Sequence, residues 1–127
     1  MFETVLFPID QYRGAQEPAG KVLELARRYG SRLVLLSVLQ PASAEMHVHE
    51  AVAEVLREIR ERFEQAGVTY QEVERSGKPA CVICDVADEL NVDVIVMGIG
   101  GANLESDSGS TAARVLQLTS CPVLVVP

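Results

Sequence analysis

Residues 92–127 read VDVIVMGIGGANLESDSGSTAARVLQLTSCPVLVVP, and this stretch decides the fold. It begins with residues 92–97, an almost wholly apolar and β-branched run that predicts a strand covered on both faces. Residues 110–119 have apolar side chains at helical spacing, and residues 122–126 form a second apolar run. A strand, a glycine-rich loop, a helix and another strand indicate one unit of a parallel α/β sheet.

The loop inside this unit has the composition of an anion site. It carries Gly98, Gly100, Gly101 and Gly109, followed at once by Ser110 and Thr111. Glycine lets the backbone approach a ligand closely, and free N–H groups at the start of a helix attract anions. The spacing matches neither the dinucleotide fingerprint nor a P-loop, which has a lysine after its last glycine. We interpret the segment as a phosphate site, and the alternative is a turn with Ser108 or Ser110 as N-cap.

The same loop is acidic. It has no Lys or Arg between Gly98 and Ser110 but contains Glu105 and Asp107. Carboxylates repel a polyphosphate unless a divalent ion such as Mg²⁺ stands between them. Asp107 is also the residue type that the dipole at a helix start favours, and this is the interpretation we prefer. We assign no metal ligand.

The rest of the chain repeats the alternation of strands and helices. Further strands are expected at residues 4–9, 32–39 and 68–74, and helices from Pro18 to Gly30, at 46–66 and from Pro79 to Asn91. This pattern predicts one domain over residues 1–127, an α/β fold with a five-stranded parallel sheet and helices on both faces. Residues 68–74 mix polar and apolar side chains as an edge strand does, which favours strand order 3-2-1-4-5.

That strand order gives Asp10 a functional interpretation. It makes the first and fourth strands neighbours at the point where the chain reverses direction across the sheet, and ligands bind there in α/β proteins. Asp10 follows the first strand directly and would lie beside the glycine-rich loop. In isolation an Asp at this place is more often a turn or helix cap.

Composition narrows the class of partner. The 127 residues carry a formal net charge of −7, which disfavours binding to nucleic acid and to anionic membranes. Nearly half of the residues are apolar, yet no run approaches membrane-spanning length. Three cysteines in a core-rich chain fit a reducing compartment, so we expect a cytoplasmic protein.

No catalytic set is visible in the sequence. Cys81 and Cys84 form a C-x-x-C pair, which is compatible with a redox role, but their apolar surroundings favour packing. His47 and His49 lie far in sequence from the glycine-rich loop, and we interpret them as surface residues.

Taken together, these segments resemble the universal stress protein family over essentially the whole chain. The resemblance rests on residues 7–10 (FPID), 35–38 (LLSV) and 93–98 (DVIVMG), and on the interval from Gly109-Ser110-Thr111 to residues 121–126 (CPVLVV). It implies a flavodoxin-like fold related to the adenine-nucleotide hydrolases, and homodimers formed through the last strand, Pro122 to Val126.

One branch of the family binds ATP through a G-x2-G-x9-G-[ST] motif, and the resemblance implies the following contacts. Pro8, Asp10 and Val38 would surround adenine and ribose. Met97, Gly98, Gly100 and Gly101 would line the ribose–phosphate path, and Gly109, Ser110 and Thr111 would hold phosphates. Only seven residues separate Gly101 from Gly109 here, so this loop is better suited to AMP, ADP or a cyclic nucleotide than to the triphosphate of ATP.

The resemblance therefore implies a dimeric sensor or signalling module for the stress response that binds an adenine nucleotide, ATP, ADP or AMP, with or without Mg²⁺. Its protein partner is not specified by the sequence. One alternative is an interaction module of the same fold that binds no nucleotide. The other is a slow ATPase, for which no catalytic residue stands out.

Overall fold

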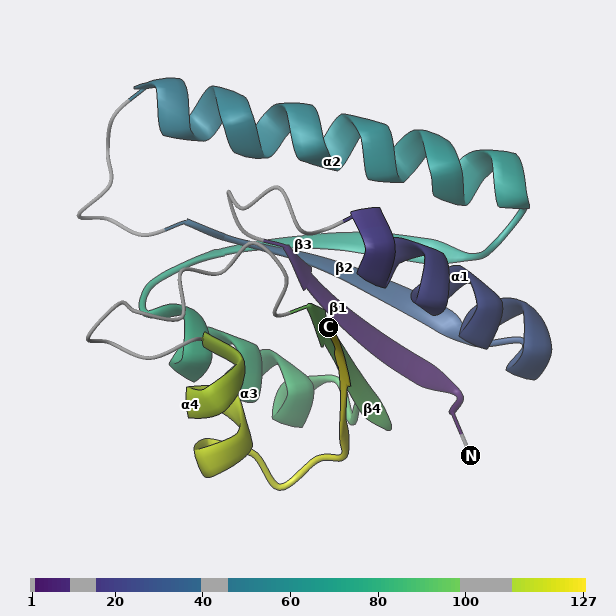
Figure 1. Cartoon of the computed structure of the whole chain (residues 1–127). Coiled ribbons are helices and arrows are strands. Elements are labelled where there is room, and N and C mark those ends of the chain that lie inside the picture. The colour runs from purple at the N-terminus through teal and green to yellow at the C-terminus, as the bar shows by residue number, and fades with distance from the viewer. Residues whose placement is uncertain (1, 10–15, 40–45, 99–110) are drawn as a thin grey trace.

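The computed structural model describes residues 2–9, 16–39, 46–98 and 111–127. Its elements are β1 (Thr4–Ile9), α1 (Gln16–Tyr29), β2 (Arg32–Leu39), α2 (Met46–Ala66), β3 (Tyr70–Ser76), α3 (Pro79–Glu89), β4 (Val94–Gly98), α4 (Thr111–Leu118) and β5 (Val123–Val126). The strands form one parallel sheet in the order β3-β2-β1-β4-β5 (Figure 1). The predicted fold class and strand order are confirmed.

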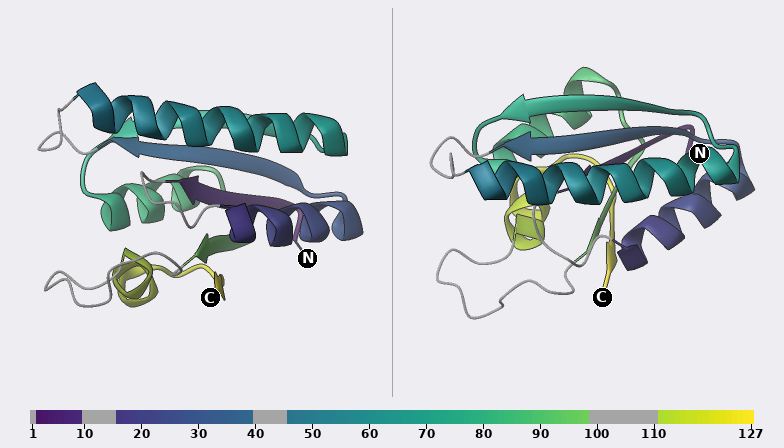
Figure 2. Two further views of the ribbon diagram at one scale, coloured as in Figure 1. Left: turned by 45° about the horizontal axis from the view of Figure 1, so that its top comes forward. Right: turned by 90° about the horizontal axis from the view of Figure 1, so that it is seen from above.

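Two helices cover each face of the sheet. α1 and α2 lie on one side, and α3 and α4 lie on the other (Figures 1 and 2). Side chains alternate between the faces along β1, so Val5 and Phe7 join the core under α1 and α2, while Leu6 joins the core under α3 and α4. This double burial explains why the central strands are continuous apolar runs.

Three strands begin later than the sequence predicted: β3 and β4 by two residues and β5 by one, and β3 also ends two residues later, at Ser76. In β3 and β4 the delay arises because the first residues of the predicted strand bond to the preceding helix. The Val68 amide donates to the Phe63 carbonyl of α2, and β3 starts at Tyr70. The Val92 amide likewise donates to the Ala87 carbonyl of α3, and β4 starts at Val94. At its other end β4 extends to Gly98, the first residue of the predicted glycine-rich loop.

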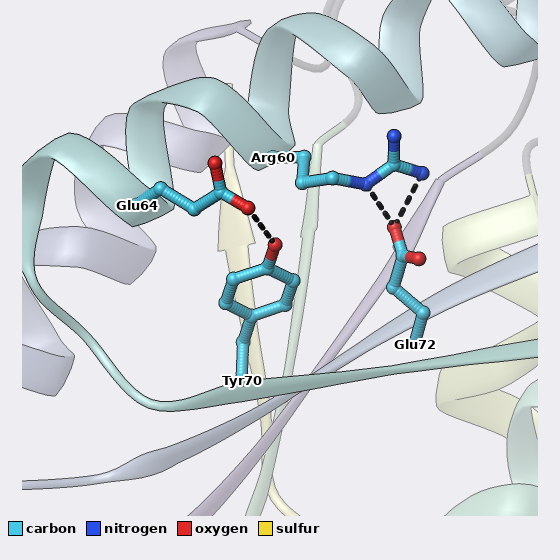
Figure 3. Close-up of polar contacts among 4 residues, drawn as sticks. All are labelled: Arg60, Glu64, Tyr70 and Glu72. Atoms are coloured by element: carbon cyan, nitrogen blue, oxygen red, sulfur yellow. Dashed lines mark hydrogen bonds and ion pairs between the residues drawn. The ribbon is translucent and has the colours of Figure 1, made fainter.

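The two edges of the sheet differ in chemistry. Side chains of β3 form polar contacts with the helices on either face: Arg60 with Glu72 (2.8 Å), Tyr70 with Glu64 (2.9 Å) and Arg75 with Glu89 (3.1 Å). Figure 3 shows the first two. Exposed ion pairs stabilise a fold only slightly, but a charged edge strand resists pairing with another chain.

The opposite edge, β5, is apolar in sequence. Its four residues are Val, Leu, Val and Val, and Leu124 is 43% exposed. On the neighbouring α4, Leu116 and Leu118 are also exposed. Among the described residues, no helix combines the length and apolarity needed to cross a membrane.

Candidate functional site

Five of the residues predicted to form the site lie in the described part of the chain, and all five are at the carboxyl edge of the sheet. Pro8 is the penultimate residue of β1, and Val38 stands one residue before the end of β2. Met97 and Gly98 close β4, and Thr111 opens α4. Parallel strands bring these positions to one side of the molecule, the side toward which the arrows of β1, β2 and β4 point in Figure 1.

The other five predicted site residues, Asp10, Gly100, Gly101, Gly109 and Ser110, lie outside the described residues. The predicted phosphate contacts of the glycine-rich loop therefore stay predictions. The structure does describe the first residue of α4 and the ends of the three strands at the site. These strand ends, which we call the floor of the site, contribute Pro8, Val38, Met97 and Gly98.

That floor is apolar. Val38 and Met97 are each 6% exposed and share the core under α3 and α4 with Ala112 of α4. Gly98, one residue further along β4, is exposed. The strand ends thus combine buried apolar side chains with an exposed glycine, whose backbone is available for polar contacts.

Pairing between the strands is uneven at this edge. Three of the four ladders run to the carboxyl ends of their strands: β1–β2 ends at Ile9↔Ser37, β2–β3 at Leu39↔Ser76 and β4–β5 at Gly98↔Val126. The ladder between β1 and β4 contains only Val5↔Val94 and Leu6↔Ile95. The two strands that flank the switch point are thus unpaired over the part nearest the site.

Two neighbouring residues at the carboxyl ends of the strands, between β3 and α3, were predicted as part of a turn but not among the site residues. Gly77 has φ 144°, and its amide donates to the Leu39 carbonyl at 3.0 Å. Lys78 follows as the exposed residue before the first turn of α3. The Gly-Lys-Pro sequence signals a turn, and a positive charge at the carboxyl edge could have been inferred from it.

Two of the three cysteines, Cys84 and Cys121, pack against the core under α3 and α4, whereas Cys81 is exposed and does not have the packing role predicted for it. Cys84 and Cys121 are half-buried against the core on this face, and the Cys121 thiol lies 3.3 Å from the Val92 carbonyl. Burial raises the pKa of both thiols, and nearby Asp88 adds to the rise. Protonated, partly buried thiols favour the packing interpretation over a redox one. In the described part of the chain, no three His, Cys, Asp or Glu residues are grouped as a metal site would require.

Comparison with curated proteins gives a relative that is similar over the whole chain. The universal stress protein Sll1654 of Synechocystis is 43% identical over 136 aligned residues, which cover 100% of this chain and 87% of that protein.

Solved structures with the same fold include two nucleotide complexes. A universal stress protein in complex with cAMP superimposes with a TM-score of 0.79 at 22% identity, covering 98% of this chain and 96% of that one. The universal stress protein of Archaeoglobus fulgidus in complex with dAMP gives a TM-score of 0.77 at 21% identity, covering 100% and 98%. At these identities the likeness shows the fold.

The sequence model of the family described as "Universal stress protein family" matches residues 1–127. Together with the 43% identity to Sll1654, this match shows that the chain belongs to the universal stress protein family.

Proposed function

We propose that this protein binds an adenine nucleotide at the carboxyl edge of its sheet, between β1 and β4, and acts as a dimeric sensor or signalling module in the stress response. The observation that carries the proposal is the gap in pairing at the switch point, with Pro8 on one side of it and Met97 and Gly98 on the other. Ligand sites of open α/β sheets form at such points.

The contacts follow the order of the strands. Pro8, Asp10 and Val38 would enclose adenine and ribose, and the backbone from Met97 to Gly101 would follow the ribose toward the phosphates. Gly109, Ser110 and Thr111 would then bind phosphate at the start of α4, where amide groups and the helix dipole favour an anion. The cAMP and dAMP complexes of proteins with this fold support a nucleotide of this class.

A monophosphate or a cyclic nucleotide fits the chemistry of the loop better than ATP. The loop brings two carboxylates, Glu105 and Asp107, and no cationic side chain. Each further phosphate adds negative charge close to these carboxylates, so ATP would need Mg²⁺ to offset the repulsion. We therefore expect affinity in the order AMP or ADP above ATP when Mg²⁺ is absent.

Signalling would work by population shift. Nucleotide stabilises whichever arrangement of residues 99–110 contacts it, and a protein partner distinguishes that arrangement from the others. The effect on the partner is limited by the difference in nucleotide affinity between the two arrangements.

The proposed dimer uses β5. This edge strand is apolar, whereas the other edge strand, β3, is charged and engaged with α2 and α3. Antiparallel pairing of β5 with its copy across a two-fold axis would cover residues 123–126 and supply their unpaired backbone groups with partners. We place this dimer in the cytoplasm, where the three free thiols stay reduced.

The proposal is tested by isothermal titration with AMP, ADP and ATP, each with and without Mg²⁺. Thr111→Val should weaken AMP binding about fivefold, because it removes one hydroxyl donor to phosphate. Ser120→Ala is the matched control, since Ser120 is exposed in the turn after α4 and should leave affinity unchanged. Absence of binding by all three nucleotides, together with absence of nucleotide released from the natively purified protein by denaturation, would favour the interaction module that binds no nucleotide.

A further inference from the structure

The β1–β4 ladder stops short of the site although both strands continue past its last pair. β1 extends three residues beyond Leu6, to Ile9, and β4 extends three beyond Ile95, to Gly98. On its other side, β1 stays paired with β2 as far as Ile9. The interruption therefore concerns one side of β1 only, and its cause must lie in a group that faces β4.

Hydrogen bonds at the amino ends show which backbone groups face which neighbour. The Thr4 amide donates to the Asp93 carboxylate at 2.8 Å, and the Thr4 carbonyl accepts from the Asp93 amide at 2.9 Å, so the polar groups of Thr4 face β4. The Glu3 carbonyl accepts from the Arg32 amide at 2.8 Å and so faces β2. Because backbone groups alternate along a strand, residues 4, 6 and 8 face β4.

On β4, the Ile95 amide donates to the Pro122 carbonyl at 2.9 Å and so faces β5. Val94 and Val96 therefore face β1. In a parallel ladder that contains Leu6↔Ile95, the next hydrogen bond runs from the amide of residue 8 to the carbonyl of Val96. Residue 8 is proline and has no N–H to donate.

We propose that Pro8 is a positioning residue that ends the β1–β4 ladder and so keeps the floor of the site open. Proline is excluded from central strands except near their ends, and β1 is the central strand of this sheet. The carbonyl of Val96 loses its strand donor in a residue with no solvent exposure, and leaving a buried backbone acceptor without that donor costs stability. The consequence for nucleotide binding rests on the proposed function; the consequence for strand pairing does not.

The test replaces Pro8 with residues that restore the N–H. Pro8→Ala and Pro8→Val should each add the missing hydrogen bond, and the amide of residue 8 should exchange with deuterium at least about a hundredfold more slowly than an unprotected amide. Closing the ladder should also weaken AMP binding about fivefold to tenfold. Pro79→Ala is the matched control: Pro79 is at the first turn of α3, where an added N–H meets no strand carbonyl.

Two results would overturn the proposal: an amide at position 8 that exchanges at the unprotected rate in both variants, or a protected amide with AMP affinity unchanged. If the unmodified protein binds no AMP, the proposed function fails, and amide exchange at position 8 alone then decides whether Pro8 interrupts the ladder. A protected amide in that case supports the interruption, and an unprotected one refutes it.

Discussion

Thr4 and Asp93 form a reciprocal pair at the amino ends of β1 and β4. The Asp93 carboxylate accepts from the Thr4 amide at 2.8 Å, and the Asp93 amide donates to the Thr4 carbonyl at 2.9 Å. The two strands are thus hydrogen-bonded to each other at their amino ends, while their carboxyl ends are not paired with each other.

Replacing Asp93 should destabilise the protein without altering the site directly. Asp93→Ala leaves the Thr4 amide without its carboxylate acceptor, and we expect a loss of about 1–3 kcal/mol in the free energy of unfolding. Asp93→Asn keeps an oxygen acceptor and should lose less than half of that. Urea denaturation measures both variants. Equal stability of Asp93→Ala and the unmodified protein would show that the pair contributes nothing.

The backbone at Gly77 predicts a second sensitive position. Its φ of 144° is a conformation that other residues rarely adopt, and a Cβ there would lie 2.9 Å from a methyl group of Val82. Gly77→Ala should therefore cost about 2–4 kcal/mol of unfolding free energy, from backbone strain together with the steric contact.

Gly30 offers the comparison, because its φ is 62° and nothing lies within 4 Å of a Cβ added there. Gly30→Ala should cost only about 1 kcal/mol. Combining Gly77→Ala with Val82→Ala should remove the steric part of the loss, which a double-mutant cycle would reveal. Similar losses at Gly77 and Gly30 would mean that the contact with Val82 is relieved without cost.

The buried thiols predict a loss of stability at alkaline pH. Burial raises the pKa of Cys84 and Cys121 above the ordinary value of 9.0, so the folded state resists their ionisation. Their contribution is fully present below the unfolded-state pKa and is lost as pH rises through the folded-state pKa. Unfolding free energy should accordingly fall as the pH rises above the ordinary thiol pKa of 9.0.

The double variant Cys84→Ala/Cys121→Ala should show a shallower fall above this pH in urea titrations. Cys81→Ala is the control, because the Cys81 side chain is exposed and its removal should leave the slope as it was. Tyr70, whose pKa is raised mainly by burial, contributes in the same direction at higher pH in all variants. An unchanged slope in the double variant would contradict the assignment to the thiols.

The apolar edge predicts the oligomeric state. Light scattering at micromolar concentration should give a dimer, and Leu124→Glu should convert it to a monomer by placing a carboxylate in the seam. Gln65→Glu adds the same charge on the exposed face of α2 and should leave the dimer intact. If the unmodified protein is a monomer, the prediction that β5 forms a dimer interface is wrong.

Much of the fold could be predicted because the sequence pattern is strong where burial is complete. The apolar runs of β1 and β2 predicted strands whose bounds agree with the structure, and the polar composition of β3 predicted an edge. The first residues of β3 and β4 were wrong, since Val68 and Val92 read as strand residues although their amides cap helices. Local composition does not record which of two partners an amide binds.

The site could be predicted only in outline. Strand order brought Pro8 and Met97 to one edge, and the family pattern supplied roles for them. The pairing of Thr4 with Asp93 could not be read from the sequence, because it joins residues far apart in the chain through backbone groups that every residue has. The interruption at Pro8 was visible as a proline near a strand end, but its consequence depended on which neighbour that residue faces.

The most direct test of the central claim is an NMR titration of the isotopically labelled protein with AMP. Binding at the carboxyl ends of the strands predicts the largest amide shifts at Ile9, Val38, Gly98 and Thr111. Little change is expected at Ser31 and Gly67, which lie at the amino ends of the strands. Saturable shifts confined to the first group would support a nucleotide site at the β1–β4 switch point. No shifts at millimolar AMP, or shifts centred on the amino ends of the strands, would contradict it.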